Sequence, residues 1–161
     1  MNKDDISEIW DTITPKLYGY LVNTLRDKSL AEDILQAAWL KAIENLFQFK
    51  GGETEFSSWL FMIARNECRQ HWRKAGREIL FDLALHDREA SDGREEDKIF
   101  LDQIVGKLSL SDQELLRLRY IGGLSLREIA KILKINAVAA RVRMHRAISG
   151  AKAVLQKQYE K

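Results

Sequence analysis

The sequence has few of the residues that build several common classes of protein. Among 161 residues there is one cysteine, Cys68, and one proline, so an internal disulfide is impossible and a thiolate metal site is disfavoured. No apolar run approaches the roughly 20 residues that a membrane-spanning helix requires. The N-terminus is acidic at Asp4 and Asp5 and lacks the apolar core of a secretion signal. We therefore expect a cytoplasmic protein.

Strand signals are also scarce, whereas helical spacing of apolar residues is abundant. Apolar residues make up 45% of the chain, so a core can form. The sequence predicts an all-α fold of two small helical domains. We expect these domains at residues 1–76 and 99–161, with an acidic linker at 77–98. An apolar island within the linker, Ile79–Leu85, must pack on this chain or on a partner.

Local signals predict where the helices begin and end. Thr14 and Pro15 indicate that a first helix stops and a second begins, with Thr14 as N-cap. Three Ser-x-x-Glu capping boxes, at 29–32, 111–114 and 125–128, predict three further helix starts. The remaining expectations are a helix that passes Ile43 and ends near Phe47, a long helix over Phe56–Ala75, and a last helix after a turn at 134–136, capped by Asn136 and reaching about Gln158.

Charge divides the chain into three parts, although the net charge is only +2. Residues 1–75 carry 10 Lys/Arg and 11 Asp/Glu, residues 76–107 carry 5 and 9, and residues 108–161 carry 11 and 4. The corresponding net charges are −1, −4 and +7. A basic last third is typical of a chain that binds a polyanion, although a solvated helix surface has the same composition.

The last third contains a pattern typical of a helix-turn-helix. A short helix with the small residue Ala130 on its packing face precedes a turn and a longer helix. The longer helix carries the basic residues Arg141, Arg143, His145 and Arg146. Arginine suits DNA because its planar guanidinium pairs bidentately with guanine edges or phosphates. We predict binding of duplex DNA; the alternative is a helical hairpin with a solvated basic face.

Aromatic and basic residues alternate along the expected helix at 56–75, which follows a glycine-containing loop at 49–55. Trp59 and Asn66 lie on related turns, and the basic residues are Arg65, Arg69, Arg73 and Lys74. This combination binds unpaired DNA, because cations follow the phosphates while aromatic faces and amide edges receive the bases. Aromatic residues at helical spacing are more often part of a core, and both interpretations stay open at this point.

The sequence does not indicate enzymatic chemistry. Cys68 and His71 lie on one helical face, with the spacing of a nucleophile–base pair, but this spacing arises by chance in any helix and no third orienting group is evident. A metal site that includes these two residues is equally disfavoured, and His86 and His145 lie in unrelated contexts. We predict that the protein is not an enzyme and holds no metal or cofactor.

Four segments carry recognisable motifs. Residues 31–42 read AEDILQAAWLKA, and Phe56-x-x-Trp59-Leu60-x-x-Ile63-Ala64-x-Asn66 follows. Residues 124–130 read LSLREIA, and residues 143–147 read RMHRA. The first two segments resemble region 2 of the extracytoplasmic-function (ECF) sigma factors of the sigma-70 family, and the last two resemble region 4. Their order and spacing are similar to those of the family, which joins the two regions by a short variable linker.

The resemblance implies an RNA polymerase sigma factor that recognises promoters and opens DNA strands. Asp33 and Gln36 would face the coiled coil of the polymerase β′ subunit; ordinary helix solvation is the alternative. The 49–55 loop and Asn66 correspond to a pocket for a base flipped from the −10 element, and a preformed pocket offsets the cost of unstacking. The implied −10 contacts are Lys50, Trp59, Arg65, Asn66, Arg69, Arg73 and Lys74. The implied −35 contacts are Arg127, Arg141, Arg143, His145 and Arg146.

Three positions depart from the family pattern. Ala37 replaces a glutamate, which removes one expected polymerase contact. Asn136 stands in a segment that usually contains a proline and a threonine; it retains a helix cap, but the threonine's phosphate contact is lost. Val142 replaces a small polar residue. These differences bear on which promoter sequence the protein recognises and not on the class of protein to which it belongs.

The implied partners are core RNA polymerase, through its β′ and β subunits, and promoter DNA, both duplex and single-stranded, with no small-molecule substrate. The resemblance also implies an anti-sigma factor that sequesters this protein. The apolar island would contribute to its binding, and such a factor could hold the protein at the membrane. Two rival interpretations remain. A helix-turn-helix regulator would have an upstream sensory or receiver domain, and its parallel βαβ pattern is not seen. A degenerate sigma-like protein would bind polymerase without opening promoters.

Overall fold

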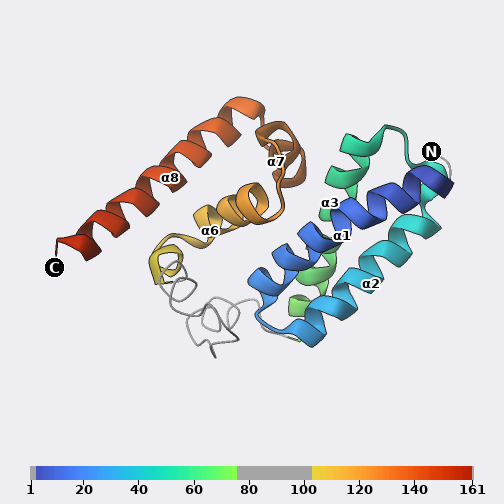
Figure 1. Ribbon diagram of the computed structural model, residues 1–161, viewed down its shortest axis with the longest axis horizontal. Helices are drawn as coiled ribbons and strands as arrows, with labels where there is room; N and C mark the ends of the chain where they lie inside the picture. The colour runs from blue at the N-terminus through green and yellow to red at the C-terminus, as the bar shows by residue number, and fades with distance from the viewer. Residues whose placement is uncertain (1–2, 76–102, 161) are drawn as a thin grey trace.

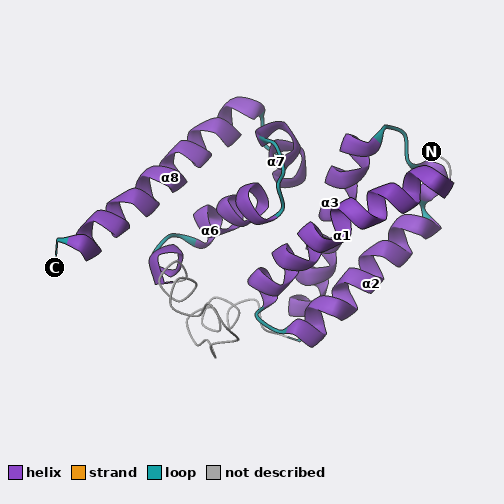
Figure 2. Ribbon diagram, viewed as in Figure 1, coloured by secondary structure: helices purple, strands orange, loops and turns teal. Residues whose placement is uncertain are grey.

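The computed structural model describes residues 3–75 and 103–160, and every regular element in them is a helix (Figure 2). The elements are α1 (Lys3–Leu25), α2 (Lys28–Glu44), the 3-10 turn η1 (Leu46–Gln48), α3 (Glu53–Lys74), α6 (Leu110–Leu116), the π-helical turn η2 (Arg117–Ile121), α7 (Leu126–Leu133) and α8 (Ala137–Tyr159). The all-α prediction is confirmed. The expected linker at 77–98, with its apolar island Ile79–Leu85, lies outside the described residues.

Helices α1, α2 and α3 form an N-terminal bundle (Figure 1). Its interior is built on large side chains, among which Tyr20, Trp39, Phe56 and Phe61 are almost completely buried. Burial of each aromatic side chain removes a large apolar area from water, so the N-terminal bundle has a large hydrophobic core of its own. The rings of Trp39 and Phe56 lie 5.8 Å apart between centroids, and those of Tyr20 and Phe61 lie 5.6 Å apart.

Helix α1 runs without interruption through Pro15, so the predicted restart at Thr14 is wrong. Ile13 and Leu17 are buried on one continuous apolar face of the helix, and their packing outweighs the cost of a proline inside a helix. The Thr14 side chain does not cap a helix. Its Oγ1 instead accepts a hydrogen bond of 3.1 Å from the indole N–H of Trp39.

Two of the three predicted capping boxes are displaced. The cap of α2 is Asp27, whose carboxylate accepts a 3.0 Å hydrogen bond from a backbone N–H, and not Ser29. The cap of α6 is Ser109, and not Ser111. In both cases an equally good capping residue stands two positions earlier, so the helix gains half a turn and satisfies the same number of end groups.

The caps around the predicted helix-turn-helix are confirmed. Ser125 Oγ accepts from the N–H of Glu128 at 3.2 Å and donates to its carboxylate at 3.1 Å, so Ser125 is the N-cap of α7. The turn passes through Lys134 in a left-handed conformation. Asn136 Oδ1 then accepts from the N–H of Ala139 at 2.7 Å and starts α8.

Helices α6, α7 and α8, with η2, form a C-terminal bundle whose buried residues are smaller. Ala130 and Ala140 are buried where α7 packs on α8, as predicted from the small residue at position 130. Beyond Ala147 no residue of α8 is fully buried, although Ile148 packs against the buried cluster. The C-terminal end of the helix projects from the rest of the molecule (Figure 1).

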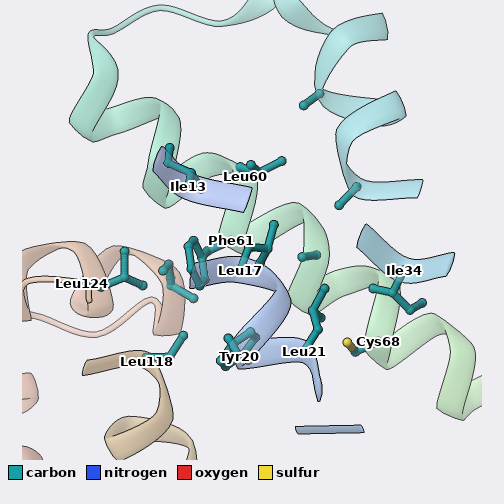
Figure 3. Packing of buried hydrophobic residues seen from close by; sticks show 14 of the residues in the cluster. Ile13, Leu17, Tyr20, Leu21, Ile34, Leu60, Phe61, Cys68, Leu118 and Leu124 are labelled. Carbon is teal, nitrogen blue, oxygen red and sulfur yellow. The ribbon is translucent and has the colours of Figure 1, made fainter. Parts of the chain in front are cut away.

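The two bundles pack against each other through a shared buried cluster. Leu118 and Leu124 of the C-terminal bundle belong to the same cluster as Leu17 and Phe61 (Figure 3). Two glycines allow the backbones to approach. A Cβ atom at Gly19 would lie 3.2 Å from Ile121, and one at Gly122 would lie 2.8 Å from a backbone carbonyl and 3.0 Å from the Phe61 ring.

Candidate nucleic-acid interface

The loop at 49–55 is shaped by a glycine and closed by a capping interaction. Gly51 has a φ of +150°, and a Cβ there would lie 2.8 Å from Glu55, so a larger residue would not fit. Glu55 accepts a 3.0 Å hydrogen bond from the N–H of Gly52. Backbone hydrogen bonds from Glu55 and Gly52 lower the pKa of the Glu55 carboxyl. Helix α3 therefore begins at Glu53, one turn earlier than predicted.

Three aromatic rings attach this loop to the N-terminal bundle. The ring of Phe49 is stacked on Trp59, with 4.9 Å between centroids, and meets the edge of Phe56 at 5.4 Å. Trp59 is half-buried as a result. We predicted from the sequence that Trp59 contacts DNA. Its stack with Phe49 covers one face of the ring, so Trp59 serves the packing of the bundle as well as the predicted contact with a base.

Most of the predicted −10 residues lie on the surface of α3 or its preceding loop. The exposed ones are Lys50, Asn66, Arg69, Arg73 and Lys74. Arg65 differs, because its side chain is only 19% exposed and is directed toward the C-terminal bundle. The predicted basic stripe is therefore divided: Arg73 and Lys74 are free to meet an outside ligand, while Arg65 is engaged within the chain.

Arg65 belongs to a polar cluster centred on Glu114 of α6. Glu114 Oε1 accepts from the hydroxyl of Tyr20 at 2.6 Å and from Arg65 Nε at 3.1 Å, and its Oε2 pairs with Arg117 at 3.5 Å. Burial, followed by the charge of Glu114, raises the pKa of Tyr20 well above its usual value. The phenol therefore stays protonated and acts as the donor. Sequence reasoning treated Glu114 as part of a capping box and missed this role.

Cys68 is buried beside this cluster and is chemically quiet. Burial raises the pKa of its thiol to about 12, with further contributions from Glu114 and Glu67. A thiol needs its thiolate form to act as a nucleophile or metal ligand. Within the described residues no three His, Cys, Asp or Glu side chains are grouped to hold a metal ion.

The predicted −35 residues are exposed, but they do not share one face. Arg127 on α7 and Arg141, His145 and Arg146 on α8 are open to solvent. Arg143 is also exposed, yet it lines a cleft between the two bundles, opposite α3. Val142 is 45% exposed on the same helix.

Helix α2 presents a mixed surface that sequence reasoning identified only in part. Asp33 and Gln36 are exposed, and so are Leu40 at 58%, Ile43 at 53% and Phe47 at 81%. Helix α2 passes Ile43 as predicted, but this side chain faces solvent, and Trp39 and Ala42 are the residues that turn inward. Spacings of three and four residues place these five side chains on one side of α2 and η1. We call them the α2 surface.

Comparison with known proteins identifies the class. Residues 9–78 match the model of sigma-70 region 2, and residues 101–149 match that of sigma-70 region 4. The chain therefore belongs to the sigma-70 family of RNA polymerase sigma factors, and its relatives place it among the ECF members. Sigma-70 region 2 occupies the part of the chain where a helix-turn-helix regulator would have its sensory or receiver domain.

Three relatives illustrate the similarity. The chain is 31% identical to RNA polymerase sigma factor CarQ of Myxococcus xanthus over 152 residues, which is 89% of this chain and 85% of that protein. It is 25% identical to ECF RNA polymerase sigma factor SigX of Bacillus subtilis, covering 94% of this chain and 82% of SigX. It is 26% identical to ECF RNA polymerase sigma factor BldN of Streptomyces coelicolor, covering 90% of this chain but only 58% of BldN.

Two solved structures share the fold. The sigma factor RpoE, in complex with the anti-sigma factor NepR from Bartonella quintana, superposes with a TM-score of 0.74 at 23% identity, covering 95% of this chain and 98% of RpoE. CnrH, in complex with the cytosolic domain of CnrY, has a TM-score of 0.71 at 21% identity, covering 97% and 90%.

None of the helices in the described part of the chain combines the length and the apolar character that crossing a membrane would take.

Proposed function

We propose that this protein directs core RNA polymerase to promoters and helps to open the DNA strands there. The observation that carries the proposal is the presence of both sigma-70 regions, in order, on one chain with two separate basic surfaces. One region alone would be compatible with a simple DNA-binding protein. Two regions allow a duplex and an opened strand to be held together when polymerase fixes their separation.

The −35 element is bound by the start of α8. Arg141, His145 and Arg146 are exposed near the N-terminal end of the second helix of the helix-turn-helix, the part that usually meets base edges in the major groove. Arg127 adds a cation from α7. No acidic residue lies between Asn136 and Tyr159, so this surface attracts the DNA backbone along its whole length.

The opened −10 strand is bound by the 49–55 loop and the exposed surface of α3. The turn at Gly51 and the Phe49–Trp59 stack provide a preformed edge, and Asn66 is exposed two turns after Trp59 on α3. Arg69, Arg73 and Lys74 follow the phosphates. A preformed surface reduces the ordering cost when a base leaves its stack.

Core polymerase docks on the α2 surface. Exposed apolar side chains beside polar ones are typical of a protein interface, because they gain free energy when a partner covers them. Leu40, Ile43 and Phe47 supply the apolar part, while Asp33 and Gln36 supply the polar part. Ala37 stands among them where the family pattern has a glutamate, which reduces the polar contribution.

When the two bundles are packed together, the protein is in a different state from the one that binds promoter DNA. In the packed state Arg65, a −10 residue, is paired with Glu114, so this guanidinium becomes available only if the bundles separate. We assign the boundaries 1–76, 77–98 and 99–161 to region 2, linker and region 4. An anti-sigma factor holding the bundles together would keep the protein inactive in the cytoplasm, or at the membrane if that factor is anchored there.

Transcription in vitro tests the proposal. Purified chain is added to core RNA polymerase with a promoter library, and transcripts and strand opening are measured. We expect promoter-specific initiation that depends on the chain. Asn66→Ala should reduce opening and Arg146→Ala should reduce −35 recognition, each by about tenfold, since one good contact to DNA is worth roughly 1–3 kcal/mol.

Matched controls separate these contacts from general effects. Gln70→Ala changes an exposed residue one turn after Asn66, and Lys152→Ala changes an exposed residue on the distal part of α8; both variants should initiate within about twofold of the unmodified chain. A chain that binds polymerase but never initiates would instead be the degenerate sigma-like protein, and normal initiation by both Asn66→Ala and Arg146→Ala would refute the assigned contacts.

A further inference from the structure

A cleft of about 350 Å³ separates α3 from the C-terminal bundle. Its walls come from both bundles, with Tyr20, Thr24 and Trp72 on one side and Leu133 on the other. Four arginines line it: Arg65 and Arg69 from α3, Arg117 from η2 and Arg143 from α8. Glu114 is the one carboxylate among the described lining residues, so the cleft has three more positive than negative side chains.

Arg117 is the least satisfied of these groups. Its side chain is 5% exposed, and its Nη2 reaches Glu114 only at 3.5 Å. Its Nε and Nη1 atoms are buried without a hydrogen-bond partner, as is the nearby Thr24 hydroxyl. Buried guanidinium donors are normally paired, because an unpaired buried charge is costly. Glu114 pairs with Arg117 but leaves two of its donor atoms without an acceptor.

We propose that this cleft binds a small phosphate-type anion that bridges the two bundles. A diphosphate group has the required chemistry: it is compact, carries several negative charges and accepts hydrogen bonds on all sides, and arginine forks match its geometry. Arg69 and Arg143 approach it from opposite walls, and Arg117 also lines the cleft. The bound anion holds the bundles together, and this inference does not rest on the promoter function proposed above.

The arrangement differs from ordinary attraction between a basic surface and DNA. Arg73 and Arg146 are exposed on the same two helices and lie outside the cleft. A buried donor such as Arg117 cannot reach a phosphate on a DNA backbone while the bundles are packed. If only substitutions of the cleft arginines weaken anion binding, the anion occupies a specific site in the cleft. If substitution of any exposed arginine weakens binding equally, the attraction is nonspecific electrostatics.

Calorimetric titration of the full chain with inorganic pyrophosphate, at constant ionic strength, tests the proposal. We expect one site per chain, with Arg69→Gln and Arg143→Gln each weakening binding about tenfold. The matched variants Arg73→Gln and Arg146→Gln should stay within about twofold. Saturating pyrophosphate should also raise the melting temperature of the unmodified chain by about 5 °C.

Arg117→Met examines the buried donors directly, with circular dichroism reporting whether the variant is folded. The folded variant should lose the pyrophosphate-induced rise in melting temperature; if it does not fold, the Arg69 and Arg143 variants still decide. Adenosine diphosphate distinguishes the source of the anion: equal affinity assigns recognition to the diphosphate alone, and tighter binding identifies a nucleotide beside Trp72. The proposal is overturned if pyrophosphate does not bind, or if only one bundle's arginine matters.

Discussion

The two bundles achieve burial in different ways. The N-terminal bundle encloses Tyr20, Trp39, Phe56 and Phe61 within three helices, and its net charge is close to neutral. The apolar side chains that the C-terminal bundle buries are leucine, isoleucine, alanine and one methionine, and its part of the sequence carries a charge of +7. It also leaves the second half of α8 without a fully buried residue.

This difference indicates that the C-terminal bundle depends on its neighbour. Leu118 and Leu124 belong to a buried cluster that includes Leu17 and Phe61 of the N-terminal bundle as well as residues of their own bundle (Figure 3). A small core with a highly charged surface has little stability in reserve. A DNA-reading module benefits from this arrangement, because contacts that are few and partly polar can be exchanged for contacts with polymerase and promoter.

The largest effect is expected at the buried cluster that joins the two bundles. Phe61→Ala removes a ring that contacts Tyr20 and lies beneath Gly122, and it should lower the free energy of unfolding by about 3–5 kcal/mol. Urea unfolding measures the loss, and hydrogen exchange locates it. Exchange should accelerate in α6 and η2 as well as in α3. Unchanged protection in α6 and η2 would show that the bundles are independent. Phe47→Ala, at an 81% exposed site, is the control.

The next effect comes from the polar contact. Glu114→Gln keeps the shape of the side chain but removes the charge that pairs with Arg65 and Arg117, and we expect a loss of about 2 kcal/mol because these guanidiniums are largely buried. The same variant should bind single-stranded −10 DNA more tightly without polymerase, since Arg65 is released. Glu44→Gln, on the surface of α2, is the matched charge control. Equal stability of the two variants would exclude an energetic role for the Glu114 cluster.

A smaller effect comes from the close approach of the backbones. Gly122→Ala places a methyl group 2.8 Å from the Leu118 carbonyl and 3.0 Å from Phe61, so one partner must shift at a cost of about 1–2 kcal/mol. Gly106→Ala is a precise control because a Cβ there meets nothing within 4 Å. Thermal unfolding of the two variants should differ by several degrees. Identical melting temperatures would mean that the bundles pack less closely at this point.

The smallest effect on stability is expected from a substitution that destabilises the C-terminal bundle only. Asn136→Ala removes the cap of α8 and should cost about 1 kcal/mol, while the N-terminal bundle keeps its hydrogen-exchange protection. Asn136→Asp, which retains a capping oxygen, should recover most of the stability. If both substitutions are neutral, the N-terminus of α8 gains nothing from this cap.

Local signals in the sequence were reliable where no competing residue stood nearby. The Ser125 cap, the Asn136 cap and the small residue at Ala130 were all identified, because each depends on a few adjacent positions. The caps at Asp27 and Ser109 were assigned two residues late, since the chain offers two suitable side chains and local rules do not rank them.

Exposure on helices was harder to predict. Ile43 fits an apolar stripe by its type, yet it is 53% exposed, because Trp39 fills the space toward α1 and α3. Pro15 fits a helix start by its type, yet it lies inside α1. In both cases packing with a partner helix outweighed a local preference, and nothing in the spacing alone reports where that partner lies. The DNA and polymerase contacts remain predictions, supported by the exposure of most of the residues assigned to them.

The sequence by itself determined the helical class, the helix-turn-helix and membership of the sigma-70 family, because apolar periodicity, caps and motifs are encoded within short stretches of chain. Tertiary structure alone decided that Glu114 meets Tyr20 and Arg65, that Arg143 faces α3, and that Gly19 and Gly122 lie at a junction. These contacts join residues dozens of positions apart. Their energies depend on distance and burial in three dimensions, which no local pattern of residues specifies.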